Sequence, residues 1–598
     1  MNPAAADVSP RALLPRVNSA SLLRRLRIAW IAVGVGCGLP TLAAPSSGAS
    51  ARQRQGVPSA VALRVDASRP RGPWRPVWRY FGYDEPNYTY MPDGRKLLTE
   101  LAEVCPRPAY VRTHNLLTSG DGTPALKWGS TGVYSEDPDG RPRYDWTILD
   151  RIFGTYVQRG LKPYVEIGFM PEALSTHPVP YQHHWAPDQH NPLSTGWAYP
   201  PKDYARWEEL VYQWVSHCVA NHGRAEVQSW YWEVWNEPNI FYWHGTPAEY
   251  HKLYDYAADG VKRALPTARI GGPEIAGTKS PGATRFLREF IVHCLRGTNY
   301  ATGHIGAPLD FVSFHAKGDP RFIDGQVRMG IAAELQDVDR GFATVASFPE
   351  LRHCPIVIGE WDPDGCAACP ATLFPQYGYR NTPLYASYTA EVLARTLELA
   401  DRHAVNLEGA LTWAFEFENQ PYFAGFRALA SRGLDLPVFN LFAMLGRMSG
   451  QRVAVESSVD PGVEALGQQG VRATPDVNAL ASLERHRLCV LLWNYHDSDT
   501  PGPAAVVELS AHHLPARDGV ARLVQYRIDR RHSDSFEAWR RMGSPALPTP
   551  AQYARLQKAG KLARLGAPRS IELRNGALTL RLRLPRQAVS LLVFEWPS

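Results

Sequence analysis

The sequence has no strong excess of charge of either sign, few cysteines and a single long apolar run. Its 598 residues include 64 Lys or Arg and 58 Asp or Glu, for a formal net charge of +6. This excess is small for the length, and no long basic run alternates with aromatic residues, which argues against nucleic-acid binding. No internal repeat is visible, which excludes a repeat architecture.

The one long apolar run lies near the N-terminus. Arg24, Arg25 and Arg27 precede the apolar stretch 28–43, which closes on small residues. A basic segment, an apolar segment and then small residues follow one another in this order in a secretory signal peptide. A membrane anchor is the alternative, but the stretch is short for a span and contains four glycine or proline residues. We therefore expect residues 1–44 to be a signal peptide, a secreted or periplasmic location, and no stable membrane insertion after cleavage.

Cysteines are scarce, and their number argues against a metal framework. Seven of the eight follow the expected signal peptide, so at least one thiol is left unpaired. Cys366 and Cys369 are separated by two alanines, but no second such pair and no His cluster accompanies them. A loop disulfide or two reduced thiols is therefore favoured over zinc. Nothing in the sequence requires a metal or an organic cofactor.

The chain is rich in apolar and aromatic residues, which make up 44% and 11% of it. After a Ser/Gly/Ala/Arg-rich linker within residues 45–73, short apolar runs alternate with amphipathic helical patterns. Eight strands, each followed by a helix, predict the α/β class and a (β/α)8 TIM barrel over residues 74–440, with its active site at the strand ends. The expected strands are 77–83, 109–113, 162–169, 227–235, 268–272, 311–315, 356–360 and 409–415.

Beyond residue 440 the pattern changes to strict alternation. In 578–584 leucines occupy one face and polar residues the other, and similar runs recur between turns. This pattern predicts an all-β sandwich accessory domain over residues 441–598. The segment 61–65, ahead of the barrel, is a candidate strand of that sandwich.

Two of the barrel strands end in carboxylates. Trp235-Asn236-Glu237-Pro238 closes the fourth strand, and Glu360 closes the seventh, 123 residues later. Proline cannot continue a strand, so the polar side chains are expected at the strand's exit. The alternative for the first motif is a helix start capped by Asn236. Two carboxylates at strand ends suit glycoside hydrolysis, which needs an acid and a nucleophile or base.

Together with strand order and the C-terminal domain, these motifs resemble glycoside hydrolase family 39, the family of β-xylosidases and α-L-iduronidases. The resemblance extends from about residue 74 to 598. It implies Glu237 as general acid/base, Glu360 as nucleophile and Asn236 as a ligand of the sugar 2-hydroxyl. It also implies that Trp413 is a platform beneath the sugar, with a buried core tryptophan as the alternative. A retaining mechanism places the two carboxyl groups about 5–5.5 Å apart.

The same resemblance assigns roles on strands two and six. Arg112, followed by His114, is expected to hydrogen-bond the nucleophile; an ordinary surface ion pair is the alternative. Arg112 and His114 on strand two and His315 on strand six are candidate substrate-binding residues. Lys317 stands where β-xylosidases of this kind have an aromatic residue, and it resembles the iduronidase lysine that binds a uronate carboxylate. The alternative is that Lys317 pairs with Asp362 or Glu360.

The sequence thus favours a retaining exo-glycosidase, β-xylosidase-like, that acts by double displacement on plant-derived oligosaccharides. A uronidase or an arabinosidase is the alternative within the family. Outside enzymes, the alternative is a catalytically inactive carbohydrate-binding protein, against which the intact Glu237 and Glu360 argue. The sequence leaves sugar identity, linkage and oligomeric state open.

Overall fold

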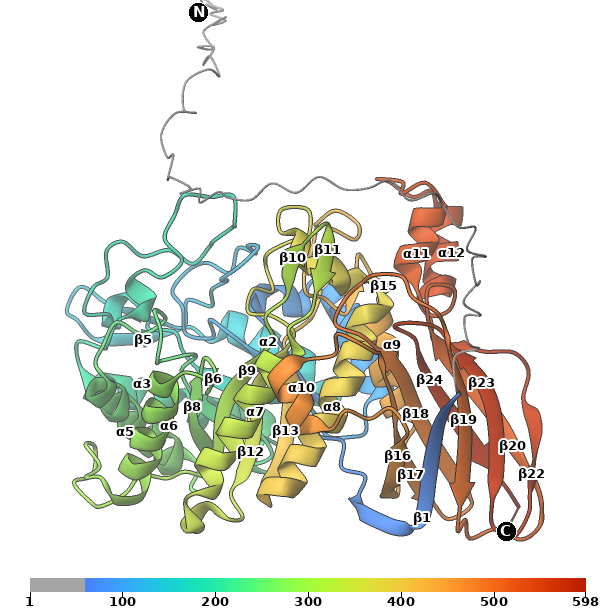
Figure 1. Ribbon diagram of the computed structural model, residues 1–598. Helices are drawn as coiled ribbons and strands as arrows, with labels where there is room; N and C mark the ends of the chain where they lie inside the picture. The colour runs from blue at the N-terminus through green and yellow to red at the C-terminus, as the bar shows by residue number, and fades with distance from the viewer. Residues whose placement is uncertain (1–59, 598) are drawn as a thin grey trace, which may run out of the picture. The chain divides into compact units, whose positions relative to one another are not determined.

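The computed structural model describes residues 60–597 (Figure 1). The expected signal peptide, 1–44, lies outside the described residues. Eight parallel strands close into a barrel in chain order, and the last pairs with the first. Each overlaps one predicted strand, so the TIM barrel is confirmed. The barrel strands are β2 (Tyr80–Tyr83), β3 (Ala109–Thr113), β6 (Leu161–Ile167), β7 (Tyr231–Val234), β8 (Arg269–Ile275), β9 (Phe311–Lys317), β12 (Pro355–Asp362) and β13 (Asn406–Thr412).

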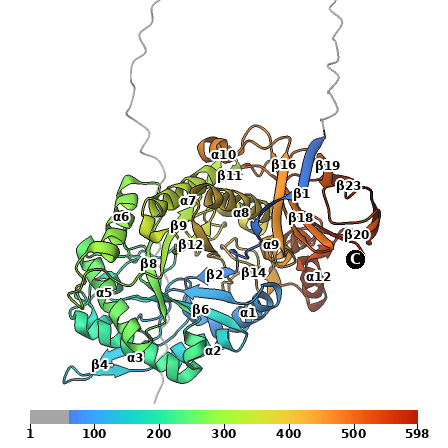
Figure 2. The ribbon, with the colours of Figure 1, turned by 90° about the horizontal axis from the view of Figure 1, so that it is seen from below.

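Helices on the outside of the barrel cover its strands (Figure 2). Apolar side chains recur at helical spacing over residues 207–218 of α3, and they are buried. The larger helices are α1 (Pro92–Val104), α2 (Thr147–Val157), α3 (Tyr204–His222), α5 (Pro247–Ala264), α6 (Pro281–Arg296), α7 (Ile331–Ala346), α8 (Pro383–His403) and α9 (Pro437–Leu445). Short elements of the barrel loops are η1 (Pro86–Tyr90), β4 (Tyr134–Glu136), β5 (Pro142–Tyr144), η2 (Glu172–Leu174), η3 (Gly196–Ala198), α4 (Arg224–Val227), β10 (Arg321–Ile323), β11 (Gln326–Arg328), η4 (Pro349–Leu351), η5 (Pro375–Asn381), β14 (Ala430–Ser431) and β15 (Leu434–Asp435).

Aromatic rings fill the interior of the barrel below its strand ends. The rings of Tyr80 and Tyr110, on neighbouring strands, stack with centroids 4.8 Å apart. A Cβ at Gly409 would lie 2.7 Å from the Tyr80 ring, so glycine is required for the ring to fit. This apolar layer closes the barrel and leaves its other end for polar groups.

The C-terminal strands form the predicted accessory β-structure. They form a ten-stranded mixed sheet, in which β1 pairs antiparallel with β16 and parallel with β19. The candidate strand 61–65 is therefore confirmed. The sheet is continuous, and strands from both of its ends share one apolar core, so the sandwich arises from one sheet curling over itself. Its strands are β1 (Val61–Pro73), β16 (Gln451–Ser457), β17 (Asp476–Glu484), β18 (Arg487–Tyr495), β19 (Ala505–His512), β20 (Gly519–Ile528), β21 (Ala563–Arg564), β22 (Arg569–Leu573), β23 (Leu578–Leu584) and β24 (Val589–Glu595).

Three helices that the alternation did not predict interrupt the accessory strands: α10 (Val463–Gln469), α11 (Ser535–Arg541) and α12 (Pro550–Gly560). The expected boundary at residue 440 falls inside α9. Figure 2 shows α8 and α9 between the barrel strands and the accessory strands. Across residues 60–597, no helix has the length and apolar character needed to cross a membrane.

The barrel and the accessory sheet share a buried interface. Leu491 and Trp493 of β18 belong to the same apolar core as the barrel helices. The Trp493 indole N–H donates to Glu391 of α8 at 2.5 Å. Arg395 of α8 pairs with Asp476 of β17 at 2.7 Å and also with Glu391 and Asp460, both at 2.8 Å, so a buried ion-pair network crosses the interface. The sheet therefore stabilises the barrel directly.

Candidate active site

Glu237 lies just beyond the end of β7, where the backbone turns sharply. Trp235 and Glu237 have φ angles of 73° and 48°, a region that costs energy for residues other than glycine. The turn is held by the amide of Glu237, which donates to the carbonyl of Glu274 at 2.8 Å. The Glu237 carboxylate contacts Nδ1 of His315 at 2.9 Å. The strand exit thus presents the carboxylate, as the motif predicted.

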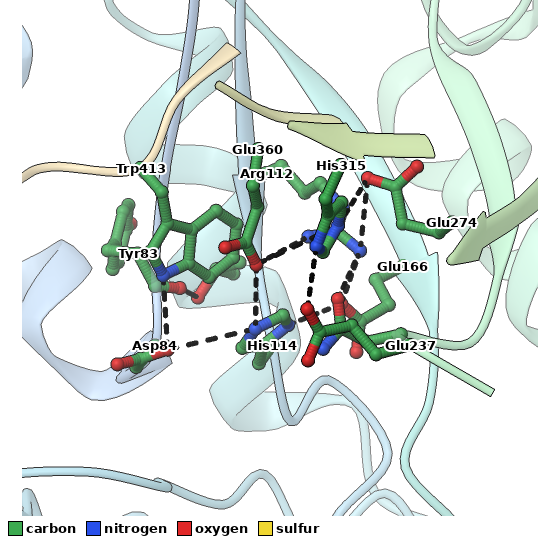
Figure 3. Close-up of polar contacts among 12 residues, drawn as sticks. Tyr83, Asp84, Arg112, His114, Glu166, Glu237, Glu274, His315, Glu360 and Trp413 are labelled. Atoms are coloured by element: carbon green, nitrogen blue, oxygen red, sulfur yellow. Dashed lines mark hydrogen bonds and ion pairs between the residues drawn. The ribbon is translucent and has the colours of Figure 1, made fainter. Parts of the chain in front are cut away.

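Glu360 lies in β12 beside Arg112, His114 and His315 (Figure 3), and Lys317 contacts its other oxygen. Lys317 Nζ lies 2.7 Å from Oε2, and His114, Arg112 and His315 lie 3.6, 3.8 and 3.9 Å from Oε1. Burial alone would raise the pKa of Glu360. The charges of Lys317 and His315 and the contact with His114 outweigh burial and hold that pKa well below its usual range. Glu360 is therefore an ionised, buried carboxylate.

His315 connects the two candidate catalytic carboxylates. Its Nδ1 contacts Glu237, while its Nε2 lies 3.1 Å from Glu274 and 3.9 Å from Glu360. Burial lowers the pKa of His315, but the negative charges of Glu360 and Glu274 and the bond to Glu237 raise it to about 10. The ring is therefore an imidazolium at neutral pH, and Glu237 and Glu360 face the same ring.

Arg112 is fully buried at the centre of this network. Its Nε donates to Glu233 at 2.8 Å, and its Nη2 lies 3.0 Å from Glu166. The same Nη2 donates to Oδ1 of Asn236 at 3.1 Å, which fixes the amide beside Glu237. Burial lowers the pKa of Arg112, but these carboxylates, led by Glu233, raise it above its usual value. The surface ion pair is thus wrong, because the side chain is 0% exposed. The expected hydrogen bond to the nucleophile is wrong as well, because Nη1 lies 3.8 Å from Glu360 and makes no hydrogen bond.

His114 and Trp413 form the wall beside Glu360. His114 Nδ1 bonds Glu166, so Glu166 contacts both His114 and Arg112. Burial lowers the pKa of His114, but Glu166 raises it above the usual value. The Trp413 ring lies 4.3 Å from the His114 ring, and its indole N–H donates to Asp84 at 3.1 Å. Trp413 is 1% exposed, so in this structure it is a buried wall of the site.

Lys317 is held between two carboxylates. Its Nζ lies 2.7 Å from Glu360 and 2.8 Å from Asp362. Burial lowers the pKa of Lys317, but the charges of Asp362 and Glu360 raise it above its usual value. Arg427 lies on the other side of Asp362, at 3.8 Å. In this structure Lys317 therefore pairs with Glu360 and Asp362, which is the alternative that the sequence left open for it.

Two further carboxylates of the site, Glu274 and Glu233, were not predicted. Glu274 is the second-last residue of β8 and has a φ of 53°. Its carboxylate occupies the space beside Gly359, where an added Cβ would lie 1.3 Å from its Oε1. Burial would raise the pKa of Glu274, but Arg112 and His315 lower it. Burial and the charge of Glu274 raise the pKa of Glu233 well above its usual value. The rule that found Glu360, a carboxylate at a strand end, also applies to Glu274, but the predicted run stopped at Gly272.

A disulfide shapes the loop that follows Glu360. Cys366 and Cys369 are bonded, so of the alternatives expected for this pair the disulfide is confirmed. Arg380 donates to the carbonyl oxygens of both cysteines at 2.6 Å and pairs with Asp364 at 2.7 Å. The guanidinium therefore fixes the loop from inside. The five other cysteines of the described part of the chain are unpaired: Cys105, Cys218, Cys294, Cys354 and Cys489.

Comparison with known proteins places this arrangement among glycosidases. Residues 61–577 match the family described as "Glycosyl hydrolases family 39". The chain is 25% identical to a β-xylosidase of Geobacillus stearothermophilus over 81% of this chain and 86% of that protein. It is 24% identical to an α-L-iduronidase of Mus musculus over 88% of this chain and 79% of that protein. A monomeric β-xylosidase structure from Caulobacter crescentus superposes with a TM-score of 0.69 at 23% identity, over 90% of this chain and all of that chain.

Proposed function

The chain belongs to glycosyl hydrolase family 39, and on that premise we propose that it is a retaining exo-glycosidase acting by double displacement. The observation that supports this most is the state of Glu360, a buried carboxylate whose pKa is held well below its usual range by Lys317, His315 and His114, with Glu237 against the same His315 ring. Ionised carboxylates are nucleophiles, and a retaining glycosidase needs one opposite an acid.

In the first step Glu360 attacks the anomeric carbon and forms a glycosyl ester. Glu237, as general acid, gives a proton to the departing oxygen. In the second step Glu237 takes a proton from water, which attacks the same carbon and releases Glu360. Lys317 and Arg112 keep the nucleophile charged before attack, and Asn236, fixed by Arg112, is positioned to bind the sugar 2-hydroxyl.

Restricted access supports cleavage at a chain end. The side chains of Glu237 and Glu360 are only 15% and 7% exposed. Such a site accommodates a terminal sugar more readily than the middle of a polysaccharide chain.

For the substrate, we propose a β-xyloside from plant-derived oligosaccharides. This rests on the β-xylosidase relatives and on Lys317, whose ammonium is already shared by Glu360 and Asp362. A uronidase of the iduronidase type is the second candidate, because the same ammonium lies beside the nucleophile, where a substrate carboxylate would compete for it. No particular contact favours an arabinosidase.

The assignment is tested with two variants and a product analysis. Glu360→Gln should abolish turnover on aryl xylosides, arabinosides, galactosides and uronides alike. Glu237→Gln should spare substrates whose leaving groups need little protonation and slow the others. Glu456→Gln, at an exposed position of the accessory sheet, is the matched control. NMR of the first product should show retention at the anomeric carbon; inversion would refute double displacement.

A further inference from the structure

A cavity of about 720 Å³ lies between the barrel and the accessory sheet, apart from the active site. On the barrel side its wall is formed by η5 and the start of α8. On the accessory side it is formed by the loop after β18, by β20 and α11, and by the end of β23. None of the active-site residues described above lines it. Its volume is within the range of about 300–1,000 Å³ typical of ligand sites.

The cavity is strongly cationic. Six arginines line it, against three carboxylates, Asp499, Asp529 and Glu537. Two of the six are paired: Arg527 with Asp529 at 3.4 Å, and Arg540 with Glu537 at 3.1 Å. Within residues 60–597, no carboxylate lies within 4.0 Å of the other four guanidinium groups, those of Arg530, Arg531, Arg583 and Arg586.

Two of the six guanidinium groups, those of Arg527 and Arg586, have a buried N–H donor that finds no acceptor in the described part of the chain. Arg527 is 3% exposed, and its Nε has no hydrogen-bond partner there. The Nε of Arg586 is also buried and lacks an acceptor. A buried cation with an unmet donor is costly, so an anion in the cavity would stabilise both guanidinium groups through their charge.

Apolar side chains complete the walls between the arginines. The Arg540 guanidinium lies over the Phe536 ring at 5.9 Å. Apolar faces beside guanidinium forks suit a ligand with both apolar faces and anionic groups, because the fork binds carboxylate or sulfate through two parallel hydrogen bonds. The apolar lining residues are Pro383, Leu384, Pro501, Phe536, Leu565 and Pro585.

We propose that this cavity binds an acidic oligosaccharide, a sugar chain bearing carboxylate or sulfate groups, at a site separate from the active site. The charge of the ligand follows from the arginines; its being a sugar chain rests on the proposed function. The segment η5 follows β12, the strand that contains Glu360, so the cavity opens among the loops at the catalytic ends of the strands. Figure 1 shows α11 at the same end as the hairpin β10–β11. A bound chain would therefore hold a longer acidic glycan beside the site that trims it.

Calorimetric binding to the full chain tests the proposal. Glu360→Gln is used as the background so that no probe is hydrolysed. The probes are an oligogalacturonate for carboxylate, a heparin-derived oligosaccharide for sulfate, a neutral xylo-oligosaccharide of equal length and inorganic phosphate. The double variant Arg530→Gln/Arg583→Gln changes two exposed side chains of the cavity. Arg581→Gln, two residues before Arg583 on β23 and outside the cavity, is the matched control.

At least one acidic oligosaccharide should bind more tightly than the neutral chain, and the double variant should weaken that binding at least tenfold. Arg581→Gln should leave it unchanged, with equal Tm for both variants. Equal loss in variant and control, no binding of either acidic chain, or phosphate binding as tightly as the chains would overturn the proposal. Turnover of aryl glycosides by the wild type tests the proposed function separately: arginine-dependent binding without turnover would refute that function and leave the anionic site standing.

Discussion

The role of Lys317 is decided by Lys317→Met, which removes one ammonium and keeps the length of the side chain. The structure places this ammonium 2.7 Å from Glu360 and 2.8 Å from Asp362. Without it, Glu360 loses the largest of the charges that lower its pKa, while the burial that raises the pKa stays. We therefore expect the pKa of Glu360 to rise.

The magnitude follows from the contact. A hydrogen bond to a charged group contributes about 1.5–3 kcal/mol. At about 1.36 kcal/mol per pH unit, losing it raises the pKa of Glu360 by roughly one to two units. Since only ionised Glu360 attacks, the acid limb of kcat/KM against pH should move to higher pH by that amount.

The assay is the pH profile of kcat/KM on an aryl xyloside and on an aryl uronide. Lys279→Met is the control, because Lys279 is half-exposed and pairs with Asp337 at 3.2 Å. Equal losses on both substrates, with a shifted acid limb, show that Lys317 serves the protein's own acids. A loss confined to uronides would show that Lys317 binds the substrate carboxylate. An acid limb that does not move would refute the electrostatic reasoning.

Three further predictions concern the rest of the chain. Truncation at about residue 440 should give insoluble or unfolded protein, because the barrel core shared with β18 would be exposed; a soluble, active barrel would contradict this. Mass spectrometry of unreduced protein should find Cys366 and Cys369 linked, and chelators should leave activity unchanged; stoichiometric zinc lost together with activity would contradict this. Burial raises the pKa of Asp497 to about 7, so the folded state holds a proton that the unfolded chain releases near pH 4. Stability should therefore fall between about pH 4 and 7, with Asp497 contributing up to about 4 kcal/mol. Asp497→Asn should reduce this slope in urea unfolding and leave the share of Asp534, whose pKa burial also raises to about 7; an unchanged slope would show that Asp497 does not contribute.

The order of the elements was predictable because it is written in local patterns. Apolar runs with helical segments between them located all eight barrel strands. The carboxylates at the ends of the fourth and seventh strands, Glu237 and Glu360, could be singled out because parallel strands of a barrel end at the same face. The short spacing of Cys366 and Cys369 likewise limited their partners.

What the sequence could not decide depends on contacts between distant residues. The sequence does not distinguish a substrate-binding Lys317 from one that pairs with the protein's own carboxylates; the structure places its ammonium between Glu360 and Asp362. Glu274 was missed because β8 continues past the apolar run that ended at Gly272, and only its contacts with Arg112 and His315 bring it into the site.

The sequence by itself determined the barrel, the accessory strands and the two carboxylates, since periodicity and strand ends are local properties. Only the tertiary structure decided which side chains of the active site are charged and how far the site is closed off from solvent. Whether a carboxylate is ionised depends on burial and on cations from other strands, as at Glu360. The arginine-lined cavity likewise exists only where the barrel meets the curled sheet, because its walls come from segments more than a hundred residues apart in the chain.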